Sequence, residues 1–127
     1  MLAAKLISYP DATAGAAAGV SFNETLNKLG IADQMKPKIK LAQGGAGAMS
    51  LLAKGEVDIG LTFLSEMNDP GIDVVGPLPK AISTPTTLVG FVSAHAKDPA
   101  AAKALLDYLS SPEAAAVYKA QGMQPGR

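Results

Sequence analysis

The 127-residue sequence contains no cysteine and no tryptophan, and aromatic residues make up only 5% of it. The absence of cysteine excludes disulfides and thiolate metal sites. Eleven basic residues balance eleven acidic ones, so no excess charge is present to attract DNA or an anionic membrane surface. We therefore expect no nucleic-acid partner, no metal site and no cofactor.

Long hydrophobic runs are also missing. The longest uncharged stretch, residues 81–96, contains Pro85 and His95 and is shorter than a bilayer-spanning helix. The first residues, MLAAKLIS, lack the sustained apolar core of a signal peptide. If the mature protein is exported, we expect this chain to lack its front end.

Hydrophobic residues nevertheless make up 48% of the chain, which is long enough to bury a core. Apolar runs typical of strands alternate with segments of helical periodicity, which predicts an α/β fold with a mainly parallel sheet flanked by helices. The expected strands are 5–9, 39–42, 57–64 and 85–93, with a weaker edge strand at 73–78, and the expected helices are 16–29, 46–54, 99–109 and 112–121.

Several helix ends are marked by their residue types. Asp98 and Ser111 are suited to cap helices that begin with Pro99 and Pro112. Gly30 stands where the residue after a helix end belongs. The expected inner face of the first helix consists of Ala14, Ala18, Phe22, Leu26 and Leu29.

One arrangement occurs twice: a strand, a loop of small residues, and a helix, at 8–18 and again at 42–48. Ligands of open parallel sheets bind at the carboxyl ends of the strands, where both loops would lie. Each helix start would present free backbone N–H groups and the positive end of a helix dipole. Thr13 could add a hydroxyl, and glycines would allow close approach of a ligand: Gly15, Gly19, Gly44, Gly45 and Gly47. The pattern indicates an anion site built from neutral donors.

The same glycines could instead serve only to make tight turns between strands and helices. No Gly-Lys-Ser/Thr follows them, and residues 44–47 do not form a dinucleotide fingerprint, so nucleotide binding is disfavoured. Catalysis has little support from residue types. His95 has no paired base and is expected at the surface, and Glu66 is the best-placed carboxylate but fits a solvated turn equally well. No serine stands in a Gly-x-Ser-x-Gly elbow.

Four motifs occur in order along the chain: SYPDATAG (residues 8–15) before a helix ending KLG, LLAKGEVDIG (51–60), LSSPEAAA (109–116) and GMQP (122–125). In this succession they resemble the carboxy-terminal part of periplasmic solute-binding proteins of the molybdate-binding type. The resemblance covers nearly the whole chain.

The resemblance implies one lobe of a two-lobed periplasmic-binding-protein-like fold. Residues 1–127 would form a single α/β domain, in which 8–84 make the second lobe and 85–122 return toward a first lobe that this chain lacks. It also implies a periplasmic, non-enzymatic component of an ABC-type transport system, which binds a small anion between the lobes and delivers it to a membrane permease.

The resemblance further implies which residues contact the ligand: Thr13, Ala14, Gly15, Ala18, Gly44, Gly45, Phe63 and Ser65. The chain departs from molybdate binders in its longer first loop, which is rich in alanine and glycine. Phe63 also stands where an aromatic hydroxyl would bind the oxyanion. The ligand could therefore be a molybdate-like oxyanion or a small carboxylate.

Two other classes of function share this fold. One is an isomerase-like enzyme acting on a small organic acid, for which Glu66 is the candidate base. The other is the effector-sensing domain of a regulator, although no helix-turn-helix is visible. A lobe without its partner would also leave apolar side chains of residues 102–118 partly uncovered, so we expect the chain to form a homodimer by exchanging its closing helices or last strand.

Overall fold

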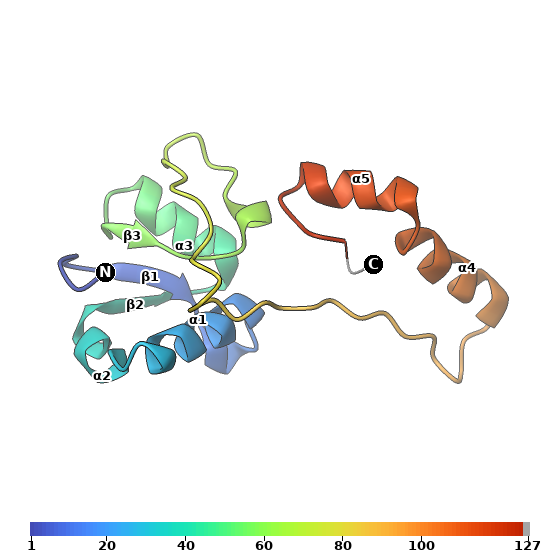
Figure 1. Cartoon of the computed structure of the whole chain (residues 1–127), viewed down its shortest axis with the longest axis horizontal. Coiled ribbons are helices and arrows are strands. Elements are labelled where there is room, and N and C mark those ends of the chain that lie inside the picture. The colour runs from blue at the N-terminus through green and yellow to red at the C-terminus, as the bar shows by residue number, and fades with distance from the viewer. Residues whose placement is uncertain (126–127) are drawn as a thin grey trace. The chain divides into compact units, whose positions relative to one another are not determined.

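The computed structural model describes residues 1–125 and contains two compact units, Met1–Thr86 and the residues from Thr87 onward (Figure 1). The first unit contains every strand in the described residues, while the second contains two helices.

The sheet of the first unit consists of β1 (Ile7–Pro10), β2 (Ile39–Ala42) and β3 (Ile59–Gly60). The strands are parallel, in the order β2-β1-β3, and Ile7 pairs with both Ile39 and Ile59. This arrangement confirms the predicted α/β class and parallel sheet. Because all strands run the same way, their carboxyl ends meet at one edge of the sheet.

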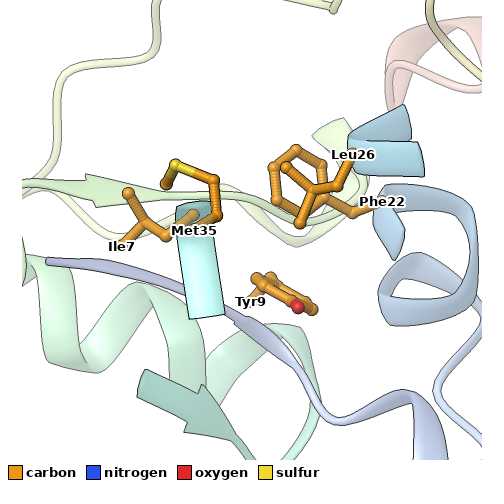
Figure 2. Packing of buried hydrophobic residues seen from close by; sticks show 5 residues of the cluster. All are labelled: Ile7, Tyr9, Phe22, Leu26 and Met35. Atoms are coloured by element: carbon orange, nitrogen blue, oxygen red, sulfur yellow. The ribbon is translucent and has the colours of Figure 1, made fainter. Parts of the chain in front are cut away.

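One face of the sheet is covered by α1 (Ala17–Lys28), which ends before Gly30 with its φ of +66°. Next come α2 (Ala32–Met35) and the 3₁₀ turn η2 (Lys36–Lys38), neither of which was predicted. The hydrophobic cluster under these elements consists of Ile7, Tyr9, Phe22, Leu26 and Met35 (Figure 2).

The opposite face is covered by α3 (Gly44–Ala53), which begins two residues earlier than predicted. Ala42 packs there with Ala48 and Met49. A Cβ atom at Gly60 would lie only 2.8 Å from the Met49 side chain, so glycine lets α3 lie close to β3. The sheet is thus a thin layer between α1 and α3, as expected for strands joined by helices.

The chain after β3 is held to α1 by side chains of that helix. The Ser21 hydroxyl donates to the Thr84 carbonyl at 2.5 Å, and the Thr25 hydroxyl donates to the Ile82 carbonyl at 2.9 Å. Lys28 adds a hydrogen bond from its ammonium to the Thr84 hydroxyl at 2.9 Å. These contacts keep the irregular segment up to residue 84 on the first unit.

Three strand predictions need correction. The expected strand 57–64 is reduced to β3, because the chain turns into the 3₁₀ turn η3 (Leu64–Glu66). The predictions of strands at 73–78 and 85–93 are wrong, since neither segment pairs with a neighbour. Val75 and Phe91 are 99% and 86% exposed, so the β-prone composition of these segments is not matched by a partner strand.

The second unit contains α4 (Pro99–Leu109) and α5 (Pro112–Ala120), close to their predicted bounds. The Asp98 carboxylate accepts from the Ala101 N–H at 2.9 Å, and the Ser111 hydroxyl accepts from the Ala114 N–H at 3.3 Å. Both predicted caps are thereby confirmed. Large apolar side chains of this unit are exposed: Leu88, Val89, Phe91, Leu105, Tyr108, Leu109 and Val117.

Candidate functional site

Three connections meet at the carboxyl edge of the sheet in the first unit. The loop after β1 contains the 3₁₀ turn η1 (Ala12–Ala14), β2 leads directly into α3, and β3 leads into η3. The Asp11 N–H donates to the Ala42 carbonyl at 2.9 Å, which joins the first two connections. Because β1 continues into α1 on one face of the sheet and the neighbouring β2 into α3 on the other, this edge is where open α/β sheets place their ligands.

The loop after β1 is organised by Asp11. Its carboxylate accepts hydrogen bonds from the Thr13 hydroxyl at 2.7 Å and the Thr13 N–H at 2.8 Å. These hydrogen bonds hold the pKa of Asp11 below its usual value. Gly15 follows η1 with a φ of +82°, a conformation that favours glycine. The N–H and the hydroxyl of Thr13, which were predicted to be available to a ligand, therefore donate to the chain's own carboxylate instead.

The other predicted contacts of this loop differ in accessibility. Thr13, Ala14 and Gly15 are exposed, whereas Ala18 is half-buried in the first turn of α1. Ala16, at the N-cap of α1, offers no side-chain hydrogen bond to that turn. The first N–H groups of α1 therefore have no side-chain cap.

The start of α3 lies against the segment that follows β3. Gly44 is exposed with a φ of +66°, while Gly45 is buried. A Cβ atom at Gly45 would overlap the Thr62 hydroxyl and the Glu66 carboxylate. Thr62 donates a hydrogen bond to Glu66, so the two side chains form a pair beside the first turn of the helix.

Phe63 and Ser65, the remaining predicted contacts, belong to this same segment. Phe63 is at the N-cap of η3 and Ser65 lies within it, and both are half-buried. The structure thus brings Gly45 together with residues 62–66 and places the loop of Thr13 after the neighbouring strand.

Two residues of this edge were missed in the sequence, Asp11 and Thr62. For Asp11 a signal was available, because an aspartate two residues before a threonine commonly accepts hydrogen bonds from its N–H and hydroxyl. Thr62 gave no such signal, since its pairing with Glu66 depends on the chain leaving the sheet after β3.

Next to the edge, the Tyr9 hydroxyl donates to the Asn23 side-chain oxygen at 2.8 Å and so links β1 to α1. Burial and the nearby charge of Asp11 raise the pKa of Tyr9, which therefore stays protonated and able to donate. His95 is exposed in the second unit, as predicted.

Within residues 1–125, no group of three or more histidine, cysteine or acidic side chains is placed to hold a metal ion. In the same residues, no helix is both long enough and apolar enough to cross a membrane. A hollow in the second unit is bordered by Lys119, Gly122 and Met123, and it includes none of the predicted ligand-binding residues.

A thin parallel sheet between helices, with helix N-termini at its carboxyl edge, defines one lobe of a binding-protein-like α/β fold. The model of the family described as bacterial extracellular solute-binding protein matches residues 2–124. The chain belongs to this family, which confirms the resemblance found in the motifs.

The sequence is also similar to two molybdate-binding proteins and to one enzyme. The molybdate-binding protein ModA of Escherichia coli (strain K12) is 34% identical over 110 residues, which cover 83% of this chain and 41% of that protein. The ModA of Azotobacter vinelandii is 31% identical, over 82% of this chain and 42% of that protein. An aconitate isomerase of a Pseudomonas species is 38% identical over 77 residues, 60% of this chain and 29% of that enzyme. The chain therefore spans less than half the length of these relatives.

Among solved structures, one described as the substrate-binding domain of a molybdenum ABC transporter from Clostridium difficile has a similar fold. The TM-score is 0.73 at 21% sequence identity, and the alignment covers 98% of this chain and 54% of that one. At this identity the comparison supports the fold alone.

Proposed function

We propose that this chain forms the second lobe of a periplasmic solute-binding protein that binds a small anion and serves an ABC-type transporter. Its partners are then the anion and a membrane permease, and it performs no catalysis itself. In this proposal residues 8–84 form the lobe, and residues 85–122 return toward a first lobe. Family membership over residues 2–124 supports the class of protein.

The proposed anion site rests on one observation, which is that the start of α3 has no side-chain cap. Its N-cap residue, Gln43, makes no side-chain hydrogen bond to the first turn, and Gly44 has no side chain to cover it. The helix begins directly at the end of β2, beside the loop that follows β1. Uncapped N–H groups and the positive end of the helix dipole favour an anion at this place.

Gly45→Ala tests this site in the 127-residue chain. We expect molybdate or sulfate to shift the amide resonances of residues 13–18 and 44–46, with dissociation constants on the order of millimolar because a single lobe surrounds only part of the anion. The added methyl group would overlap the Thr62 hydroxyl and the Glu66 carboxylate, so the start of α3 would have to shift, and binding should weaken by about tenfold.

Gly47→Ala is the matched control, because a Cβ atom there would make only ordinary contact, 3.5 Å from Ala42. It introduces the same methyl group in the same helix and should leave binding unchanged. If Gly45→Ala binds either anion as well as the unmodified chain, the anion does not bind at the start of α3.

A second function is favoured by one comparison, the 38% identity to an aconitate isomerase. An isomerase of this kind would need a base at the site, and Glu66 lies beside Gly45 at the carboxyl edge. Turnover of small tricarboxylic acids that is lost in Glu66→Gln would favour the enzyme. Binding without turnover would favour the transport component.

We further propose that the chain forms a homodimer through the apolar side chains of its second unit. Leu88 and Val117 are 79% and 60% exposed, and a second copy of these helices would cover such side chains. Sedimentation equilibrium should show a dimer at micromolar concentration, and Leu105→Lys should convert it to a monomer. A monomeric unmodified chain at that concentration would rule out the dimer.

A further inference from the structure

The Glu66 carboxylate lies beside the first turn of α3, next to the proposed anion site. A Cβ atom placed on Gly45 would overlap both the Glu66 carboxylate and the Thr62 hydroxyl, so the two side chains fill the space beside the first turn of α3. Thr62 directs its hydrogen bond to this carboxylate. A negative charge of the chain itself therefore lies beside the first turn of the helix.

We infer that Glu66 is a specificity-determining residue that disfavours oxyanions able only to accept hydrogen bonds and favours small acids that carry a hydroxyl donor. The inference rests on the proposed anion-binding function of the same edge. It deepens that function by naming the class of ligand.

The first reason is hydrogen-bond chemistry. An ionised carboxylate only accepts hydrogen bonds, and so does a dianion such as molybdate or sulfate. When such a dianion approaches the start of α3, it meets a like charge and no complementary donor at Glu66. A hydroxy acid can turn its hydroxyl toward Glu66 and its own carboxylate toward the free N–H groups of the helix.

The second reason is competition for donors. The Thr62 hydroxyl is one of the neutral donors next to Gly45, and its proton is already given to Glu66. At the neighbouring loop, Asp11 takes both donors of Thr13 in the same way. In each of these two connections, a carboxylate of the chain already accepts the nearby donors. Fewer donors are therefore left for a dianion.

Glu66 also has room to move. It is exposed, and it belongs to the short turn η3 rather than to the sheet. Its carboxylate accepts one hydrogen bond among the described residues, the one from Thr62. Glu66→Gln keeps the size of the side chain and its ability to accept from Thr62, so the variant removes the charge while preserving the packing beside Gly45.

The test compares sodium molybdate with sodium malate, a hydroxy acid, by amide chemical-shift titration of the 127-residue chain and of Glu66→Gln. We expect Glu66→Gln to bind molybdate about tenfold more tightly, because a like charge near the helix start is gone. Malate should gain less, because the neutral amide oxygen of glutamine accepts a hydrogen bond from its hydroxyl more weakly than the carboxylate does. The ratio of the two affinities should therefore move toward molybdate.

Glu56→Gln is the control for net charge. Glu56 follows the other end of α3 and pairs with Lys40 at 2.5 Å. Its replacement should leave the ratio unchanged. An unchanged ratio in Glu66→Gln would overturn the role of Glu66 while leaving the anion site in place. If neither ligand shifts any resonance of residues 44–46 in either chain, the anion site itself is wrong, and the role of Glu66 is overturned with it.

Discussion

Gly19→Ala should destabilise the chain by about 3 kcal/mol, the upper range for forcing an extra methyl group into a packed interior. Gly19 lies in α1 and is buried against the end of β1. Its added Cβ atom would overlap the Pro10 carbonyl oxygen and would lie 2.8 Å from the Ala12 nitrogen. Both obstacles are backbone atoms, so no side-chain rotation relieves the clash. The helix must move away from the sheet.

Urea unfolding followed by circular dichroism measures this effect. Gly47→Ala controls for the replacement of a helical glycine by alanine. Both substitutions replace a helical glycine by alanine, which by itself favours the helix by up to about 1 kcal/mol. At Gly47 the new methyl group meets only ordinary contacts, so this variant should be as stable as the original or more stable. Equal stability of the two variants would show that α1 does not lie as close to β1 as described.

Phe22→Ala should cost about 3–5 kcal/mol, because it removes a large side chain from the centre of the first unit and leaves a cavity. Phe22 is 4% exposed, and its ring packs edge-on against Tyr9 with centroids 4.9 Å apart (Figure 2). The same substitution should also disturb the candidate site, because its packing partner Tyr9 belongs to β1 and this strand leads into the loop that contains Asp11.

Phe91→Ala provides a matched control for this prediction, since the Phe91 side chain is 86% exposed. The same chemical change there should alter the free energy of unfolding by no more than about 0.5 kcal/mol at concentrations where the chain is monomeric. Comparable losses at the two positions would mean that residues 87–93 are buried in solution.

The helices α1, α3, α4 and α5 could be predicted from the sequence because their signals are local. Asp98-Pro99 and Ser111-Pro112 place an N-cap and a proline within two residues of each other, and the side chains form the expected hydrogen bonds. The predicted end of α1 at Gly30 was equally readable. The order of strands and helices was sufficient for the α/β class, and the succession of four motifs was sufficient for the family.

Pairing of strands depended on contacts that the sequence does not display. Residues 85–93 have a composition typical of a strand but no neighbour to pair with, and the run 57–64 contributes only Ile59 and Gly60 to the sheet. The backbone hydrogen bonds of a strand come from a different part of the chain, so composition indicates a preference and the partner decides the outcome.

The sequence by itself determined the helices α1, α3, α4 and α5, the parallel sheet, the family and the glycine-rich loops at the ends of β1 and β2. Only the tertiary structure placed Glu66 and Thr62 beside Gly45. The reason is physical. Local signals act over three or four residues, whereas Gly45 and Glu66 are brought together by the register of parallel strands and by the point at which the chain leaves β3.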